Sequence, residues 1–292
     1  MSIQKFIGFI TTEKRYSPHT IKAYLSDLRQ FESFVRSDFE LIDVKHADHT
    51  MIKSWSISLK TQGLDNRSIN RKITTLRSYY HYCLKNEMID KIPVGQVKSL
   101  KIKKRLPTFI PLSDLENPKT SLPENTYEEI RDKLIIEVFY QTGMRLSELT
   151  QLKESDIDFH TNTVKVIGKR NKQRIIPFQN SLKSLFLDYI RARNNEIELN
   201  TNTLFVTKRG KPAYPEMINK IVHQRLNEIT TIHKTSPHVL RHTFATHLLN
   251  KGANLMAIKE LLGHSSLSAT QIYTHTSIEQ LKKIHQQAHP KG

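Results

Sequence analysis

Apolar residues recur at helical spacing through the first hundred residues of the chain. In the stretch SPHTIKAYLSDLRQFESFV they fall three or four positions apart, as on one face of a helix: Ile21, Tyr24, Leu25, Leu28, Phe31 and Val35. Ser17 followed by Pro18 is typical of a helix N-cap and its first helical residue. The stretch NRSINRKITTLRSYYHYCLK repeats the pattern with Ile69, Ile73, Leu76, Tyr80 and Leu84. The sequence therefore predicts a helical N-terminal domain, residues 1–97.

The stretch VKSLKIKKRLPTFIPLS has no apolar periodicity. Its positive residues come before Pro107 and Pro111, and they are Lys98, Lys101, Lys103, Lys104 and Arg105. Prolines without periodicity favour an extended segment, and the run of positive charge suits a phosphate backbone. We therefore expect a basic linker at residues 98–111, followed by a second domain at residues 112–292.

The second domain begins with helical patterns in NTYEEIRDKLIIEVFYQTG and RLSELTQL. Three short runs rich in β-branched and aromatic residues follow, DIDF, TVKVIG and RIIPF. Such runs, separated by turn residues, predict a small antiparallel meander with a basic turn at its tip. The patterns are helical again from Leu182 to the closing SIEQLKKIHQQAHP. The expected fold is mostly α with a small antiparallel β-meander.

The chain of 292 residues carries 45 Lys and Arg against 28 Asp and Glu, a net charge of +17. Such an excess favours nucleic acid as the partner. No apolar run approaches the ~20 residues that span a membrane, and the N-terminal stretch lacks the pattern of a secretory signal. The single cysteine, Cys83, excludes an intramolecular disulfide and a cysteine-based zinc finger. We expect a soluble cytoplasmic protein that binds no membrane.

Basic side chains off the apolar stripes are candidates for DNA contact. A stripe with positive residues on the other faces suits a helix lying along DNA, but a solvated charged face fits this pattern equally well. The candidates are Arg67, Arg71, Lys72, Arg77, Lys101, Lys103, Lys104, Arg105, Arg170 and Lys172. Arg174, near the same hairpin, fits a contact with the DNA backbone slightly better than simple solvation.

The stretch SPHVLRHTFATHLL places histidine and arginine side chains at the start of a predicted helix. Ser236 and Pro237 should begin the helix, which puts His238 in its first turn with Arg241 on the same face. The N-terminus of a helix attracts anions, and arginine matches two phosphate oxygens. His238 and His242 also have the spacing of a helical zinc motif.

Zinc is disfavoured, because valine follows His238 where that motif has glutamate, and Arg241 would add a positive charge beside the ion. For His242 and His247 we favour ordinary structural roles. A phosphate-loop nucleotidase is disfavoured too, because its glycine-rich motif does not occur.

Further candidates stand in similarly special positions. Gly143 can end one helix, which leaves Arg145 at the start of the next. Lys169 follows Gly168 at the tip of the hairpin. A later helix stops at Gly263, just before His264, and Tyr273 falls in the second turn of the following helix. Each residue alone has a structural explanation, and only their joint spacing points to a phosphate site.

Taken together, the stretches TGMRLSEL, GKRNK, HVLRHTFATHLL and LLGHSSLSATQIYTH resemble the motifs of the tyrosine recombinase family, specifically its Xer-type bacterial members. The resemblance implies strand cleavage through a 3′-phosphotyrosine bond, with Tyr273 as the nucleophile. The other implied catalytic residues are Arg145, Lys169, His238, Arg241 and His264. Glu148 matches the acidic position of the family and would orient its neighbours. The scheme requires neither metal nor other cofactor.

The resemblance further implies a two-domain clamp around double-stranded DNA, made of a SAM-like core-binding domain and a catalytic domain. It implies a tetramer, made either of copies of this chain or of this chain and a partner recombinase. This tetramer would act at a dif-like site together with the septal DNA translocase. The closing helix would dock into a neighbouring protomer, although packing on its own domain fits the pattern equally. The alternatives are a mobile-element integrase and a DNA-binding protein without catalysis; a type IB topoisomerase is disfavoured.

Overall fold

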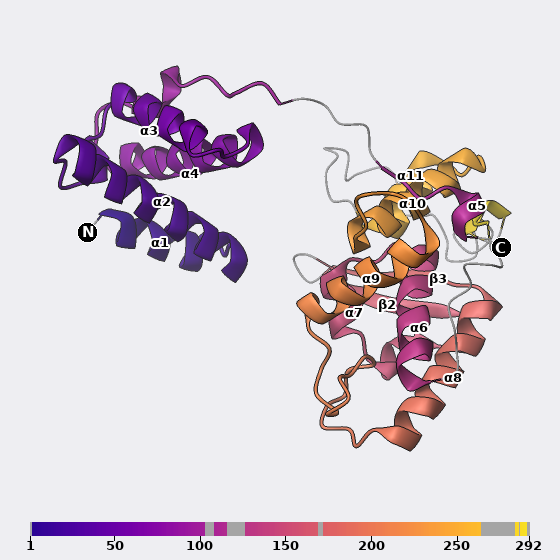
Figure 1. The fold of residues 1–292 in the computed structure, drawn as a ribbon. Helices are drawn as coiled ribbons and strands as arrows, with labels where there is room; N and C mark the ends of the chain where they lie inside the picture. The colour runs from indigo at the N-terminus through magenta and orange to yellow at the C-terminus, as the bar shows by residue number, and fades with distance from the viewer. Residues whose placement is uncertain are drawn as a thin grey trace. The chain divides into compact units, whose positions relative to one another are not determined.

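The computed structural model describes residues 2–102, 108–115, 126–168, 172–263, 284–285 and 287–290. The chain separates into two compact units, Met1–Arg105 and Leu106–Gly292 (Figure 1). The division falls within the segment 98–111 that the sequence suggests as a linker. No helix among the described residues is long and apolar enough to cross a membrane.

The N-terminal unit is helical. Its α-helices are α1 (Ser2–Thr12), α2 (Pro18–Phe39), α3 (His49–Thr61) and α4 (Asn66–Lys85), with 3₁₀ turns η1 (Val44–His46) and η2 (Pro93–Gln96). As predicted, Ser17 caps α2 by accepting a hydrogen bond from the backbone N–H of Thr20, and Pro18 follows it. The apolar stripes of α2 and α4 face one core, in which the Cys83 side chain is buried. Leu84 was expected on the α4 stripe, but it lies in the last turn of the helix and is exposed.

The second unit holds the small sheet. Its elements are α5 (Leu112–Leu115), α6 (Tyr127–Thr142), α7 (Leu146–Gln151), η4 (Glu154–Asp156), β1 (Ile157–Asp158), β2 (Thr163–Ile167), β3 (Gln173–Pro177), α8 (Asn180–Glu196), α9 (Pro215–Ile229), α10 (Pro237–Asn250) and α11 (Leu255–Leu262). The strands pair antiparallel in the order β1-β2-β3, and Val166 pairs with Arg174. The predicted class, mostly α with a small antiparallel meander, is confirmed.

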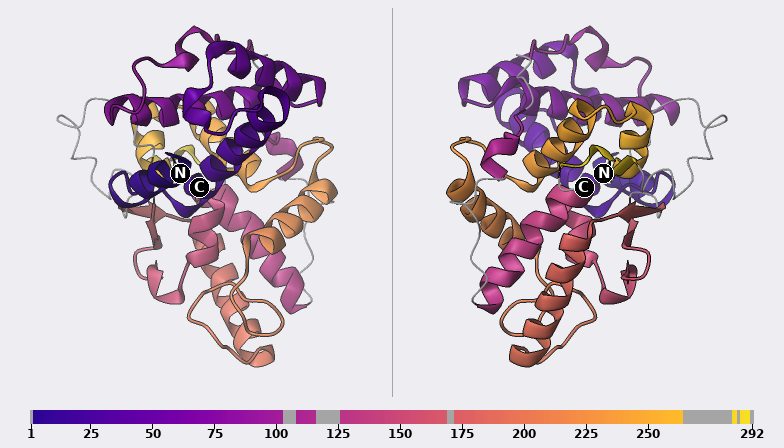
Figure 2. Two further views of the ribbon diagram at one scale, coloured as in Figure 1. Left: turned by 90° about the vertical axis from the view of Figure 1, so that its left-hand side faces the viewer. Right: turned by 90° about the vertical axis from the view of Figure 1, so that its right-hand side faces the viewer.

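Helix α6 is the central element of this unit. Its residues Leu134, Ile135 and Ile136 are consecutive and all buried, so apolar contacts surround the helix instead of following one stripe. It packs against α8, α9 and α10. Both views in Figure 2 show α6, in magenta, running beside α8, in salmon.

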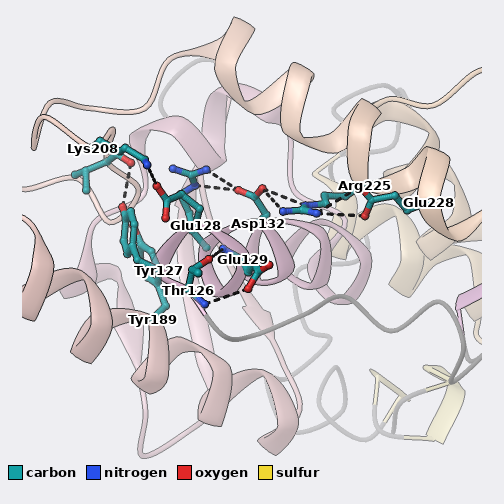
Figure 3. A network of polar contacts seen from close by, with 11 residues as sticks. Thr126, Tyr127, Glu128, Glu129, Asp132, Tyr189, Lys208, Arg225 and Glu228 are labelled. Carbon is teal, nitrogen blue, oxygen red and sulfur yellow. Dashed lines mark hydrogen bonds and ion pairs between the residues drawn. The ribbon is translucent and has the colours of Figure 1, made fainter.

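Polar contacts anchor the first turns of α6 to its neighbours (Figure 3). The Thr126 hydroxyl oxygen caps the helix, and the Glu129 carboxylate accepts a hydrogen bond from the Thr126 backbone N–H. Asp132 accepts a hydrogen bond from Arg225 of α9 at 3.1 Å. Tyr127 stacks on Tyr189 of α8 with ring centroids 5.8 Å apart. These contacts fix one end of α6, and its other end leads directly to Arg145.

The described part of the C-terminal tail packs on its own unit. His285 donates from Nε2 to the carbonyl oxygen of Gln141 at 2.7 Å, and His289 lies 3.3 Å from that of Tyr140. Both carbonyls belong to the last turns of α6, and the two imidazole rings stack 5.0 Å apart. These described residues pack on their own domain, and docking of the closing helix into a neighbouring protomer stays a prediction. Residues 264–283 lie outside the described part of the chain.

Candidate active site

Gly143 makes the turn that presents Arg145. It ends α6 in the left-handed region, with φ of 58°, and its N–H donates to the carbonyl oxygen of Phe139. A Cβ at this position would meet the side chains of Phe244 and Leu262 at 3.0 Å or less. Glycine is therefore required both for the backbone conformation and for the close approach of α10 and α11. Arg145 then becomes the N-cap residue of α7, as the sequence predicts.

Helix α10 presents His238 and Arg241 from its first two turns. Ser236 accepts a hydrogen bond from the backbone N–H of Val239, and Pro237 begins the helix, which confirms the predicted cap. His238 is exposed in the first turn. Arg241 is buried, and its guanidinium donates to the carbonyl oxygens of Gly143 and Leu262. Arg241 therefore holds the end of α6 against the end of α11.

Three arginines converge on the last carbonyl groups of α11. Arg174 donates from Nε to Leu261 at 2.7 Å, and Arg241 donates from Nη2 to Leu262 at 2.6 Å. Arg145 donates from Nη2 to Gly263 at 3.0 Å. The final carbonyls of a helix have no partner within the helix, so these contacts satisfy acceptors that would otherwise be orphaned. The result is a cluster of guanidinium groups just before His264 in the chain.

Glu148 joins two of these arginines. Its carboxylate accepts from the backbone N–H and Nη1 of Arg145 at 2.7 and 2.8 Å. It also accepts from Nη1 and Nη2 of Arg174 at 2.7 and 2.8 Å. Burial alone would raise the pKa of Glu148, but the hydrogen bonds and charge of Arg174, and then those of Arg145, lower it below the ordinary value. Glu148 is therefore ionised near neutral pH and orients its neighbours.

The cluster carries an excess of positive charge. Burial, and then the nearby charges of Arg145 and Arg174, lower the pKa of Arg241 to about 10, and only Glu148 opposes them. Three guanidinium groups with one carboxylate leave positive charge that a bound anion would neutralise. Arg145 is partly exposed, with 23% of its side chain accessible, so the cluster reaches solvent there. A phosphate group fits this chemistry.

The structure brings together Arg145 and Arg241 of the expected catalytic set with Glu148, the expected supporting residue, and His238 lies on the same helix as Arg241. The other three expected residues, Lys169, His264 and Tyr273, lie outside the described residues. The glycines preceding two of them border the cluster: a Cβ on Gly168 would lie 3.5 Å from Glu148 Oε1, and the Gly263 carbonyl binds Arg145.

Arg174 is one of the residues that sequence reasoning misplaced. We expected it to favour the DNA backbone, yet only 11% of its side chain is exposed and Glu148 holds it. The sequence pattern of the strand could have shown this. Side chains alternate between the two faces of a strand, so Arg174, two residues before the buried Ile176, lies on the same face as Ile176. Arginine at an inward position of a strand indicates a buried partner.

The basic candidates of the N-terminal unit differ in their environments. Arg67 and Lys101 are exposed, and Arg71 is about half exposed beside Asp27. Arg77 is partly buried and donates to the carbonyl oxygen of Val97 at 2.7 Å. In the second unit, Lys172 is exposed. Lys103, Lys104, Arg105 and Arg170 lie outside the described residues.

The expectation for Lys72 does not fit the structure. Its side chain is only 8% exposed, and Nζ lies 2.9 Å from the buried carboxylate of Asp27. Gln30 accepts a second hydrogen bond from the same ammonium group. Lys72 points between α2 and α4, so it neutralises a buried acid instead of reaching a DNA phosphate.

Of the remaining histidines of α10, His247 has the ordinary structural role that we expected. His247 is buried, and its Nδ1 lies 3.1 Å from the Tyr140 hydroxyl. His242 is half buried. Within the described part of the chain, no group of three or more His, Cys, Asp or Glu side chains is arranged to hold a metal ion.

Comparison with known proteins places this site in a family. Residues 117–280 match the phage integrase family, and residues 3–87 match the phage integrase N-terminal SAM-like domain. Tyrosine recombinase XerC of Bacillus licheniformis is 37% identical over 295 residues, covering 98% of this chain and 95% of that protein. Tyrosine recombinase XerC of Lacticaseibacillus casei is 34% identical over 293 residues, covering 99% of this chain and 98% of that protein.

A solved structure agrees with these sequence matches. The XerH site-specific recombinase, bound to a difH substrate before cleavage, superposes with a TM-score of 0.67 at 26% identity. The match covers 89% of this chain and 78% of that one. The two-domain match and the arginine cluster lead to one conclusion: the chain belongs to the phage integrase family of tyrosine recombinases, enzymes that cut and rejoin DNA.

Proposed function

We propose that the protein is a site-specific recombinase that cuts DNA with Tyr273 and resolves chromosome dimers at a dif-like site. One observation carries the proposal: Arg145 and Arg241, from different helices, meet at the end of α11 beside the buried carboxylate of Glu148. The positive excess of this cluster, partly open to solvent at Arg145, suits a single phosphodiester group.

Arg145 and Arg241 would bind the non-bridging oxygens of the scissile phosphate. Each guanidinium is already oriented by a backbone carbonyl, so little reorganisation is required when charge develops in the five-coordinate transition state. Their field also favours the phenolate form of Tyr273, whose unperturbed pKa would be about 10. Glu148 is fully hydrogen-bonded and serves to hold Arg145.

In the cleavage step, the Tyr273 oxygen attacks phosphorus and its proton passes to His238. The bond from phosphorus to the 5′ oxygen breaks, and Lys169 supplies the proton to that oxygen. His264 donates a hydrogen bond to a phosphate oxygen. Attack by a new 5′-hydroxyl group reverses the step and restores the tyrosine proton, so the bond energy is conserved and no nucleotide is consumed.

We further propose the organisation that fits this reaction: a core-binding domain of residues 1–97, a basic linker of residues 98–111 and a catalytic domain of residues 112–292. Closed as a clamp around duplex DNA, these parts would assemble on two sites as a tetramer. The protomers would be copies of this chain or a mixture with a partner recombinase in the cytoplasm, activated by the septal DNA translocase. Near-complete alignment with XerC proteins and the likeness to XerH bound to difH support this assignment.

A nicked duplex carrying the host's dif-like sequence tests the chemistry. Cleavage beside the nick releases a short oligonucleotide and traps the covalent adduct, which a denaturing gel detects. Wild type should form the adduct without added metal or nucleotide, whereas Tyr273→Phe should bind the duplex equally and form none. Binding by both proteins without any adduct, even when the partner recombinase is present, would contradict the proposed catalysis.

The choice of DNA site needs its own test. A plasmid with two dif-like sites should be resolved by the protein with its partner, and an otherwise identical plasmid with scrambled sites should not. Recombination confined to the ends of a mobile element would instead identify an element integrase.

A further inference from the structure

Arg174 occupies a position between three elements of the catalytic unit. It lies on β3, its Nη atoms bind Glu148 of α7, and its Nε binds the Leu261 carbonyl oxygen at the end of α11. A Cβ on Gly263 would lie 3.2 Å from Arg174 Cδ, so the side chain also packs under the last residue before His264. Arg145 also bonds both to Glu148 and to the end of α11, but it does so from the start of α7, whereas Arg174 ties both of them to the sheet.

The hydrogen bonds of Glu148 are fully taken in this arrangement. A carboxylate offers about four acceptor positions, and Arg145 and Arg174 fill them with two donors each. Only one of the two Arg145 donors belongs to its guanidinium, the other being the backbone N–H. Arg174 thereby limits how much of the Arg145 guanidinium the carboxylate can bind.

We propose that Arg174 is a positioning residue for strand cleavage, which holds Glu148 so that Arg145 stays available to the phosphate and fixes the end of α11 before His264. The inference rests on the proposed role of Arg145 in binding the scissile phosphate. Without Arg174, the freed acceptor positions of Glu148 would attract the guanidinium of Arg145 into a bidentate pair. The carbonyl of Leu261 would lose its donor at the same time.

Arginine is specifically suited to this position. Its planar fork bonds both carboxylate oxygens while Nε reaches a third acceptor in a different direction. The compact ammonium of lysine would keep the positive charge but could not make all three contacts. Charge alone would therefore restore only part of the function.

The test is the rate of covalent adduct formation on the nicked duplex, measured with enzyme in excess so that DNA binding is saturated. Arg174→Met should slow this step by about 100-fold, the scale of a small misplacement of reacting groups. Arg174→Lys should form adduct about tenfold faster than Arg174→Met, since it restores the positive charge without the planar guanidinium group. The dissociation constant for the duplex should stay within about twofold of wild type, because Arg174 is buried away from solvent.

Arg193 provides a matched control. It is a buried arginine of the same unit, bonded to the carbonyl oxygen of Leu204 and paired with Glu154, without a contact to the arginine cluster. Arg193→Met should lower the melting temperature and leave the rate of adduct formation unchanged at a temperature where it is folded. An equal loss of rate in both variants would assign Arg174 a merely structural role and overturn the proposal.

A double variant tests the route through Glu148. Because glutamine attracts Arg145 less than a freed carboxylate does, Arg174→Met combined with Glu148→Gln should form adduct faster than Arg174→Met alone. A loss equal to the product of the two single losses would mean that Arg174 acts independently of Glu148 and would overturn the proposal. If the main defect is instead a larger dissociation constant for the duplex, Arg174 contacts DNA, and this result would also contradict the proposal.

The wild-type measurement separates this inference from the proposed function. If wild type forms no adduct under any of these conditions, the proposed catalysis fails. If wild type reacts and both Arg174→Met and Arg174→Lys form adduct at the wild-type rate, only the positioning role of Arg174 is wrong. The lysine variant keeps the test decisive if the methionine variant is unstable.

Discussion

Arg145 donates a hydrogen bond from Nη2 to the carbonyl oxygen of Gly263 at 3.0 Å, across 118 positions of the chain. The contact joins the start of α7 to the last residue before His264. Arg241 makes the neighbouring contact with Leu262. Because both arginines are proposed to bind the scissile phosphate, the same side chains that would recognise DNA also set where the segment carrying Tyr273 begins.

The planar fork of Arg241 should matter more than its charge. Arg241→Lys keeps a positive group but cannot donate to both Gly143 and Leu262 while also binding phosphate. We expect adduct formation on the nicked duplex to fall by about 100-fold to 1,000-fold, the usual effect of losing one oriented donor. Binding affinity, measured in parallel by gel shift, should change far less. A lysine variant that cleaves at the wild-type rate would exclude Arg241 from transition-state stabilisation.

Gly143→Ala should strongly destabilise the catalytic unit. The substitution places a side chain at positive φ and drives Cβ into Phe244 and Leu262, so strain and overpacking add to about 2–5 kcal/mol. Chemical denaturation measures the loss. Gly252→Ala is the matched control, since Gly252 also has positive φ but no neighbour within 4 Å. It should cost only about 1–2 kcal/mol, and equal losses would exclude the predicted clash.

Stability should fall as the medium is acidified from about pH 6.5 towards pH 4. Burial lowers the pKa of His285 from its ordinary 6.5 to about 4, although its bond to Gln141 opposes the shift. In this window the unfolded chain binds the proton and the folded chain does not, so acid favours unfolding. Denaturation at pH 7.5 and at pH 5 measures the effect.

Over this pH range, protonation of His285 should lower the free energy of unfolding by at most about 3 kcal/mol. His285→Gln keeps a donor for the Gln141 carbonyl but does not titrate, so it should flatten the pH dependence. Glu148 acts at lower pH, because its pKa is depressed below 4.5 and its stabilisation is lost only below that value. An unchanged slope in the glutamine variant would show that another group titrates in this range.

Lys72 and Arg67 should respond differently although both lie on α4. Arg67 is exposed, so Arg67→Gln should weaken DNA binding and reduce the log–log salt slope by about 0.9 if it contacts one phosphate. Lys72→Met should lower the free energy of unfolding by about 1–3 kcal/mol, because Asp27 loses a buried partner. Its salt slope should match wild type; a reduced slope would return Lys72 to the DNA-contacting set.

Local patterns were sufficient for the helices, the meander and the turns that present the site. Ser236 and Pro237 begin α10, and Gly143 and Gly263 end their helices in the left-handed conformation. These features could be predicted because caps and left-handed glycines act within one helical turn of the chain. The order of the motifs also identified the family, since each marks a position that the chemistry constrains.

By itself, then, the sequence predicted the main helices, the meander and the family, and it supplied the residues that we propose to carry the reaction. Only the tertiary structure decided which charges face one another: Lys72 reaches Asp27 across 45 positions, and Arg174 reaches Glu148 across 26. Both cations had been placed towards DNA because a basic residue looks the same in the sequence whether solvent, phosphate or a buried carboxylate lies opposite. The partner is supplied by another element, and packing brings that element into contact only when the chain folds.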